Sequence, residues 1–244
     1  MKYQLFEVGG KIRDEFLGLK SKDVDYSVVL EDTSLPMDVA FDMFKEQLES
    51  EGFEIFLPKP ECVTIRAMFP KDHKYSGVAD FVLARKELYY PKDSRTPVCG
   101  LGTLEDDITR RDFTVNALAK DEYGCLIDMF NGVMHIKQGL LDTPRDPYQT
   151  FLEDPLRIIR GMRFAITKNM VLSSRVRDAI KEIGIQGIEK VSVERVREEL
   201  EKCFYFDTPK TLYYMYYMKH TLGFDLIDYA FNGTGLKLKP TNKE

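Results

Sequence analysis

The sequence predicts a mixed α+β protein whose head contains a small mixed sheet and whose second part is all helical. Two observations support this. Up to about residue 130 short β-type runs alternate with a helical pattern, and after residue 150 amphipathic helical patterns follow one another. A chain of 244 residues suits two lobes. We expect a head over residues 1–135, a helical part over 136–235 and a tail over 236–244.

The elements of the head follow from its apolar runs. Strands rich in Val, Ile and Phe are expected at residues 4–8, 25–30, 63–69 and 78–84. Residues 37–50 have helical periodicity, and Gly52 can end that helix. The first strand should lead through two glycines into a short helix and then into the second strand.

In the second part, three segments are expected to be amphipathic helices: residues 153–167, 173–182 and 192–204. The last begins at Ser192, a residue type that favours the N-cap, with Glu194 in the first turn. Residues 211–229 are dense in Tyr and Met. Such a stripe could stack nucleic-acid bases, but we favour a core or interface face.

Composition limits the class of protein. A hydrophobic fraction of 43% and a charged fraction of 31% are typical of an ordinary globular chain. No run of about 18 apolar residues is present, and the first residues are too acidic for a signal peptide, so we expect a cytoplasmic protein without membrane contact. The formal charge of −5 restricts any nucleic-acid site to a local basic patch.

Cysteines and histidines are scattered and contain no C-x-x-C pair, which argues against a structural zinc site or a disulfide framework. They are Cys62, Cys99, Cys125, Cys203, His73, His135 and His220.

A motif of glycines and acids follows the first strand. Gly9 and Gly10 permit close backbone approach, and the helix start behind them could bind a triphosphate, with Arg13 one turn further on. Asp23 and Asp25 are two residues apart, so on a strand both carboxylates face one side. Paired hard oxygen ligands favour Mg²⁺ and suit two-metal phosphoryl transfer. Alone, the pattern also fits a solvent-facing strand edge beside a glycine turn.

Asp80 is the expected third acid of this site. It is the only acid within residues 78–83, a run that otherwise has the pattern of a buried strand. A buried acid is costly unless it is paired or bound to a metal. We therefore predict that Asp80 joins Asp23 and Asp25 as a catalytic residue.

Three further motifs carry a family resemblance. Residues 110–118 (R-R-D-F-T-V-N-A-L), 153–157 (E-D-P-L-R) and 192–195 (S-V-E-R) resemble motifs of class II tRNA nucleotidyltransferases and bacterial poly(A) polymerases. With the glycine and acid motif they stand in the family's order over about residues 4–205. The resemblance implies a polymerase-β-like nucleotidyltransferase head, a helical neck and a truncated body.

The resemblance also implies roles for individual residues. Asp23 and Asp25 match the metal ligands, and an acid at Asp112 that accepts from a ribose 2′-hydroxyl would favour NTP over dNTP. Nucleotide contacts are implied for Gly9, Gly10, Arg13, Arg111, Asp112, Asn116, Asp154, Arg157, Arg160 and Arg163.

The E-D-x-x-R motif implies selection of the base without a nucleic-acid template. In the helix expected from Glu153 onward, Asp154, Arg157 and Arg160 share a broad face, while Arg163 is turned off it. A carboxylate accepts from the exocyclic amine of C or A and a guanidinium donates to the adjacent ring acceptor, whereas U and G mispair. The alternative for Arg160 and Arg163 is a solvated helix face.

We expect addition of C and/or A from CTP and ATP to tRNA 3′ ends, with Mg²⁺ as the cofactor. A poly(A) polymerase shares these motifs, although residues 59–69 lack the arginine-rich pattern of that branch. A catalytically silent RNA-binding module is a second alternative, and the intact D-x-D counts against it.

Two departures from the family stand out. The segment that matches the family's mobile loop, residues 86–103, contains Y-Y-P-K-D-S-R at 89–95, which could serve the change from C to A addition. The chain also stops soon after the last motif, where full-length relatives continue into a body and tail. We therefore expect a minimal form, a protein partner or homo-oligomer in place of the tail, or another RNA.

Overall fold

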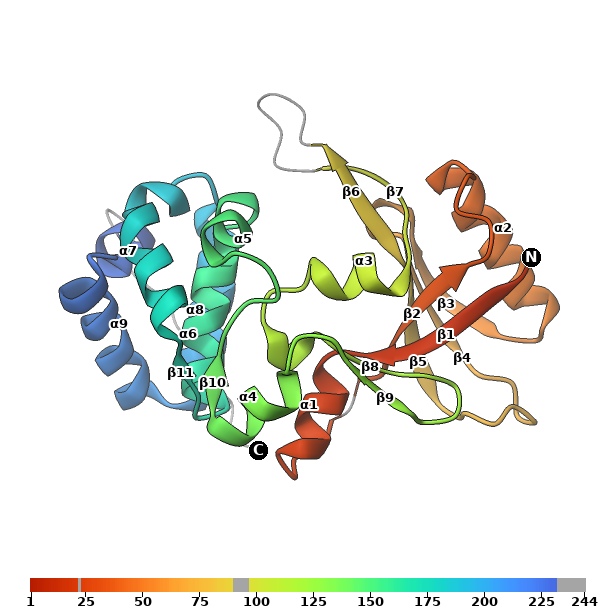
Figure 1. Ribbon diagram of the computed structural model, residues 1–244, viewed down its shortest axis with the longest axis horizontal. Coiled ribbons are helices and arrows are strands. Elements are labelled where there is room, and N and C mark those ends of the chain that lie inside the picture. Colours follow the sequence, from red (N-terminus) through yellow and green to blue (C-terminus); the bar gives the residue numbers. More distant parts are fainter. Residues whose placement is uncertain (22, 90–96, 232–244) are drawn as a thin grey trace. The chain divides into compact units, whose positions relative to one another are not determined.

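A computed structural model of the chain describes residues 1–21, 23–89 and 97–231. Contacts divide the chain into two compact units, Met1–Lys137 and Gln138–Glu244 (Figure 1). Among the helices of the described ranges, none combines the length and the apolar character that a membrane crossing requires.

The first unit contains both strands and helices. Its strands are β1 (Tyr3–Val8), β2 (Asp25–Leu30), β3 (Glu54–Lys59), β4 (Thr64–Met68), β5 (Val78–Leu83), β6 (Arg85–Tyr89), β7 (Val98–Leu101), β8 (Leu118–Lys120) and β9 (Leu126–Asp128). Its helices are α1 (Gly10–Phe16), α2 (Met37–Ser50), α3 (Leu104–Thr109) and α4 (Gly132–Gln138), with single 3-10 turns at Pro60–Cys62 and Thr114–Asn116. The four strands expected from the sequence are confirmed as β1, β2, β4 and β5, and so is helix α2.

Seven of these strands form one sheet in the order β3-β4-β5-β2-β1-β8-β9 (Figure 1). The β2–β5 pair is parallel, and the other neighbours in the sheet are antiparallel. Strands β6 and β7 form a separate antiparallel pair. The sheet is therefore mixed, and the predicted α+β class is confirmed.

Alternation along β2 assigns its side chains to two faces. Tyr26, Val28 and Leu30 belong to the main core, which also holds the fully buried Phe44 and Leu48 of α2. Burying one such side chain contributes roughly 1.5–3 kcal/mol. Because successive strand residues point to opposite faces, the side chain of Asp25 projects away from the α2 face. The sequence pattern that builds the core thus also turns the acid away from it.

In the second unit, the described residues 138–231 are helical except for turns and one parallel pair of two-residue strands. Its elements are α5 (Pro147–Glu153), α6 (Leu156–Thr167), α7 (Ser174–Ile188), α8 (Val193–Phe206), α9 (Thr208–Leu222) and α10 (Leu226–Phe231), with β10 (Leu140–Leu141) paired to β11 (Val171–Leu172). The expectation that strands end before residue 150 is wrong for β11. Two residues are too short a run to give a periodic signal.

The predicted single helix over residues 153–167 is wrong. Asp154 is extended, with φ −142° and ψ 94°, and it separates α5 from α6. A residue that precedes a proline is disfavoured in the helical region, and Pro155 follows Asp154. The Asp154 carboxylate instead accepts a hydrogen bond from the amide of Leu156 at 3.2 Å. Asp154 therefore does not share a helix face with Arg157 and Arg160.

The segment rich in Tyr and Met is divided between core and surface. Met215 and Met218 of α9 are buried, whereas Tyr213 and Tyr216 are 64% and 61% exposed. Helix α9 is terminated by Gly223, the residue after Leu222, whose φ of +69° places it in the left-handed region. The buried methionines, together with Leu222 and Phe224, bear out the core assignment, whereas Tyr213 and Tyr216 do not.

Candidate active site

A row of paired residues crosses the middle of the sheet. Val8 of β1 pairs with Asp25 of β2, and Asp25 pairs with Asp80 of the parallel strand β5. Asp80 in turn pairs with Arg66 of the antiparallel strand β4. Neighbours in register project to the same face, so the two acids and the arginine stand side by side. Asp23, two residues before Asp25, lies just outside the strand with its side chain 75% exposed.

Within this row, the negative charge of Asp25 is in unfavourable surroundings. Burial raises the pKa of its carboxyl, and the negative charges of Asp80 and Asp23 raise it further, while Arg111 and Arg66 act in the opposite direction. Repulsion between adjacent carboxylates favours binding of a positive group between them.

Arg66, which no sequence motif singles out, supplies part of that positive charge. Its guanidinium lies 3.5 Å from an oxygen of Asp23 and 3.7 Å from an oxygen of Asp80, with the arginine side chain 45% exposed. The pattern of residues 63–69 predicts the strand that carries Arg66 but no role for its side chain. The significance of Arg66 comes from its register opposite Asp80, which no local pattern reveals.

The acids do not form a ready-made metal cage. Within residues 1–21, 23–89 and 97–231, no three or more His, Cys, Asp or Glu side chains are grouped to hold a metal ion. The expected convergence of Asp23, Asp25 and Asp80 is thus incomplete, since Arg66 contacts two of them. The oxygen donors nevertheless fit Mg²⁺, which usually takes one or two carboxylates and completes its shell with water and substrate phosphates.

Gly9 and Gly10 follow the end of β1, next to the acid row formed by Asp25 and Asp80. Gly9 has a φ of +80°, and its amide donates to the carbonyl of Leu118 at 3.2 Å. A Cβ added at Gly9 would lie 2.8 Å from Nη1 of Arg111, and one at Gly10 would lie 3.3 Å from Nη2 of Arg13. The close approach expected for a ligand is therefore made by two guanidinium groups of the protein itself.

A buried polar network joins three of the predicted residues. Arg13 is 6% exposed and donates to Asp14 and to the side-chain oxygen of Asn116. The amide of Asn116 donates in turn to Asp112 at 2.9 Å. Arg13, Asn116 and Asp112 are therefore brought together as the motifs implied. Asp14, adjacent to Arg13, belongs to this network as well, and its place in the sequence motif does not predict that role.

Asp107 of α3 holds both arginines of the R-R-D motif. Its carboxylate is 2% exposed and pairs with Arg110 and, at 3.0 Å, with Nη2 of Arg111. Burial alone would raise the pKa of Asp107, but the two guanidinium groups outweigh it and hold the pKa below its usual value. The sequence offered one weak signal, an acid one helical turn before a functional arginine.

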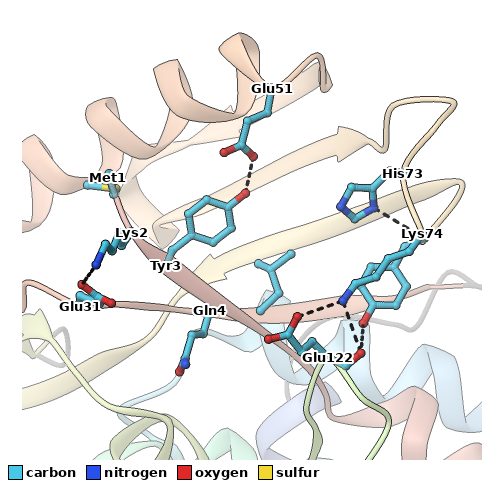
Figure 2. A pocket seen from close by; sticks show the side chains of 11 residues that line it. Met1, Lys2, Tyr3, Gln4, Glu31, Glu51, His73, Lys74 and Glu122 are labelled. Carbon is cyan, nitrogen blue, oxygen red and sulfur yellow. Dashed lines mark hydrogen bonds and ion pairs between the residues drawn. The ribbon is translucent and has the colours of Figure 1, made fainter.

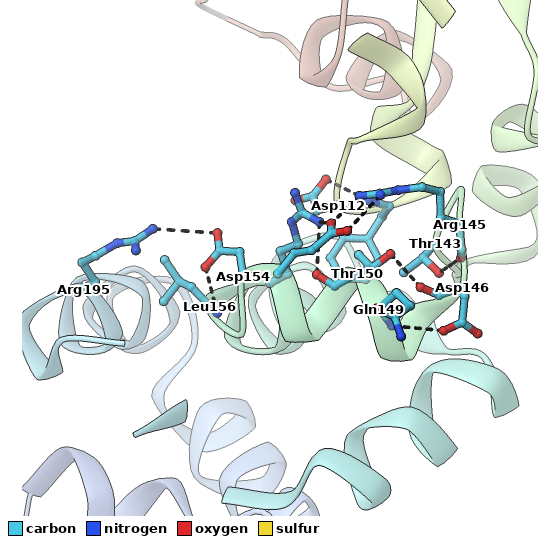
Figure 3. Close-up of polar contacts among 12 residues, drawn as sticks. Asp112, Thr143, Arg145, Asp146, Gln149, Thr150, Asp154, Leu156 and Arg195 are labelled. Carbon is cyan, nitrogen blue, oxygen red and sulfur yellow. Dashed lines mark hydrogen bonds and ion pairs between the residues drawn. The ribbon is translucent and has the colours of Figure 1, made fainter. Parts of the chain in front are cut away.

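The second unit holds the residues of the predicted base-selecting motif. In Figure 3 dashed lines join the Asp154 carboxylate to the amide of Leu156 and to Arg195, whose guanidinium lies 3.8 Å away. Arg157 donates from Nη1 to the carbonyl of Thr150 at 3.1 Å, and the same atom lies 3.6 Å from Glu153. The two side chains are anchored to different neighbours.

Arg163 is part of the packing between α6 and α8. Its Nε donates to Glu199 at 2.6 Å, and its guanidinium lies 4.5 Å from the centre of the Phe164 ring. Arg160 lies 5.7 Å from the same ring. The solvated face considered for Arg163 is not what the structure has, because the Arg163 side chain is 19% exposed and is paired with Glu199.

A cavity of about 550 Å³ lies at the other end of β1, beside Tyr3 (Figure 2). Tyr3 donates to Glu51, and Lys74 pairs with Glu122 at 3.2 Å. These polar groups are engaged with one another, and the acid row lies at the Val8 end of the strand. The cavity therefore adds nothing to the site.

Two expectations fall partly beyond the described residues. The segment 90–96 of the predicted mobile loop lies outside them, as does the tail over 236–244. The flanking strands β6 and β7 pair with each other, with Arg85 opposite Leu101.

Comparisons with known proteins agree with the resemblance drawn from the motifs. Residues 5–142 match the poly(A) polymerase head domain. The tRNA nucleotidyltransferase cca2 of Schizosaccharomyces pombe is 34% identical over 229 residues, which cover 88% of this chain and 46% of that protein.

Solved structures that resemble this chain come from the same family of proteins. The Bacillus stearothermophilus CCA-adding enzyme in complex with CTP aligns with a TM-score of 0.67 and 28% identity, over 85% of this chain and 46% of that one. A tRNA nucleotidyltransferase complexed with a primer tRNA and an incoming ATP analogue aligns with a TM-score of 0.69 and 28% identity, over 95% and 60%. The predicted polymerase-β-like head is thereby confirmed.

The chain spans about half the length of the curated relatives it matches. The match of the head domain and the identity to a tRNA nucleotidyltransferase over most of this chain are mutually consistent. The chain therefore belongs to the family of tRNA nucleotidyltransferases that carries the poly(A) polymerase head domain.

Proposed function

We propose that this chain is a template-independent nucleotidyltransferase that adds C and/or A from CTP and ATP to tRNA 3′ ends and releases pyrophosphate. The observation that supports it most is the row formed by Asp25 and Asp80, next to the glycine turn at Gly9. Similar proteins named as CCA-adding enzymes, among them one in complex with CTP, support the choice of substrates.

We propose Mg²⁺ as the cofactor, held by Asp23 and Asp25 with Asp80 beside them. When bound, the ion would supply charge stabilisation for the attacking 3′-hydroxyl and for the leaving pyrophosphate. The contribution of the protein is the pair of adjacent carboxylates, whose repulsion favours a cation. Arg66 would have to release Asp23 and Asp80 as the ion enters.

The incoming nucleotide would lie against the R-R-D motif. In this proposal Arg111 contacts the triphosphate and Asp112 accepts from the ribose 2′-hydroxyl. The side-chain amide of Asn116 donates to Asp112 at 2.9 Å, and Arg13 donates in turn to the side-chain oxygen of Asn116. This buried support would fix the acid in one position before the nucleotide arrives.

Base selection is assigned to Asp154 and Arg157. The carboxylate would accept from the exocyclic amine of C or A, and the guanidinium would donate to the adjacent ring acceptor. The extended conformation at Asp154 leaves its carboxylate 36% exposed, as a base-contacting group requires. Arg163 is better suited to holding α6 against α8, since it pairs with the buried Glu199.

A poly(A) polymerase is the second candidate, and the match of residues 5–142 to a poly(A) polymerase head domain favours it. Both activities require the same acids and the same nucleotide site. They differ in the acceptor RNA and in how many residues are added.

One experiment distinguishes these activities. The protein is incubated with Mg²⁺ and tRNAs that lack one, two or all three of the terminal nucleotides, and each labelled NTP is offered singly. Ordered incorporation of C and then A is the expected result. Long A tracts on unrelated RNA would replace the proposal by poly(A) synthesis, and no incorporation of any NTP would leave only an RNA-binding module.

A further inference from the structure

Asp107 differs from its neighbours on helix α3. Asp106 is exposed and forms the capping box with Thr103 at the start of the helix. Asp107 points inward and is 2% exposed. Its backbone amide donates to the carbonyl of Thr103 as in any helix, while its carboxylate binds the two arginines. Its two oxygens are divided between the arginines, with Oδ1 on Arg110 and Oδ2 on Arg111. A buried carboxylate in this position serves the arginines rather than the helix end.

The guanidinium of Arg111 is held from three sides. Nη2 donates to Asp107 at 3.0 Å, and Nη1 donates to the carbonyl of Asn116 at 3.3 Å. On the third side is the backbone of Gly9, where a Cβ would stand 2.8 Å from Nη1. Its side chain keeps 21% exposure, so the group is fixed but not enclosed. The same guanidinium attracts the carboxylate of Asp25, which places its charge near the acid row.

A fixed arginine binds an anion better than a mobile one. An arginine side chain that must be ordered on binding loses rotamer freedom at that moment, and this cost lowers affinity. When a buried carboxylate orders the guanidinium in advance, the cost falls on folding instead. Asp107 binds Nη2 of Arg111 and Asn116 binds Nη1, so the orientation of the planar guanidinium is fixed before an oxygen of a ligand approaches it.

We propose that Asp107 is a positioning residue for the nucleotide, acting through Arg111. It holds the Arg111 guanidinium at the glycine turn so that the triphosphate of an incoming NTP meets it in one orientation. This inference rests on the proposed function, in which Arg111 contacts the triphosphate.

The test is a double-mutant cycle on nucleotide affinity. Asp107→Asn, Arg111→Gln and the double variant are titrated with the non-reacting analogue AMPCPP in the presence of Mg²⁺, by calorimetry. Each single change should weaken binding on the order of tenfold, as expected for loss of a charge-assisted contact or of its orientation. The double variant should bind no more weakly than Arg111→Gln alone, because Asp107 acts only through Arg111.

Asp106→Asn is the matched control. It removes the same charge from the same helix without touching an arginine, so AMPCPP affinity should change by less than about twofold. Thermal melts of each variant report on folding. If Asp107→Asn does not fold, Asp107→Glu keeps the charge on a longer side chain and should weaken binding in a folded protein.

Three results would overturn the inference. Additive losses in the double variant would give Asp107 a role independent of Arg111, and unchanged affinity in Asp107→Asn would give it none. An unaltered Kd in Arg111→Gln, with tight binding retained, would refute the phosphate contact at Arg111 while leaving the proposed activity standing. Absence of AMPCPP binding by the unaltered chain would contradict the proposed function itself.

Discussion

Two carboxylates, one from each unit, have opposite electrostatic surroundings. In the first unit, Asp25 stands beside Asp80 and its carboxyl is raised in pKa by burial and by that neighbour. In the second, the buried Glu199 is surrounded by Arg163 and Lys202, which hold its pKa below the usual value against the effect of burial. One carboxylate is strained by its surroundings and the other is stabilised by them.

This difference separates residues kept for chemistry from residues kept for structure. A group whose charge is unfavourable in the folded chain gains from a ligand of opposite charge. A group whose charge is already neutralised by its neighbours has little to gain and mainly fixes the packing. Removing a group of the first kind should lower activity and raise the stability of the fold. Removing a group of the second kind should lower the stability of the fold without a direct effect on the chemistry.

Asp25→Asn carries the largest expected effect. Turnover should fall by a factor of about 10²–10³ or more, the usual cost of losing one preorganised electrostatic group. The melting temperature without metal should rise at pH 7, because repulsion with Asp80 disappears. Since the folded pKa is raised above 3.8, the destabilisation by the native acid is present above the folded pKa and absent below pH 3.8. The gain of the variant should therefore vanish on acidification, which melts across pH would reveal. A lower melting temperature at pH 7 would contradict the comparison.

Glu199→Gln tests the other unit. Arg163 would lose its buried partner, and the free energy of unfolding should fall by about 3 kcal/mol, the low end for breaking a buried ion pair. Because the folded pKa of Glu199 is depressed, its stabilisation is present above pH 4.5 and lost as pH falls through the folded pKa. Denaturant titrations at pH 7 and pH 3 measure both effects. A variant that loses turnover at full stability would instead place Glu199 in the chemistry.

Arg157→Gln should leave the fold and relax base choice. Loss of the guanidinium donor removes about 1–3 kcal/mol of discrimination between C or A and U or G. Competition between labelled CTP and UTP on a tRNA that lacks its terminal nucleotides gives the ratio directly. An unchanged preference for C over U in the variant would overturn the assignment of Arg157 to base selection.

Arg66→Gln carries the smallest expected effect. Its guanidinium competes with a cation for Asp23 and Asp80, so its removal should tighten Mn²⁺ binding without nucleotide by a few-fold, in line with the small energies of half-exposed pairs. Mn²⁺ titration followed by electron paramagnetic resonance measures this. Weaker Mn²⁺ binding in the variant would mean that Arg66 orders the carboxylates rather than competes for them.

Much of the fold could be predicted from local patterns. Residues 37–50 had the helical period that α2 fulfils, and the four apolar runs appear as β1, β2, β4 and β5. The short strands β8 and β9 have three residues each and no alternation long enough to detect. At Asp154 two local signals conflict: Pro155 favours a break, whereas the helical period of the flanking residues favours one continuous helix, and the structure follows the proline.

The candidate site shows the same division. The motif residues Arg13, Asn116 and Asp112 were selected from sequence, and the structure joins them in one buried network. Arg66 and Asp107 could not be selected in that way. Their importance lies in what they face, and their partners are set by strand register and by the turn at Gly9.

The sequence by itself determined the family, the order of the motifs and the chemistry that their side chains permit, because these depend on residue type and short spacing. Only the tertiary structure decided which charges stand together. In the folded chain Asp25 lies beside Asp80, Arg66 contacts Asp23 and Asp80, and Arg111 is paired with Asp107. Electrostatic interactions depend on distance in space, and residues far apart in the chain acquire that distance only when the sheet has formed.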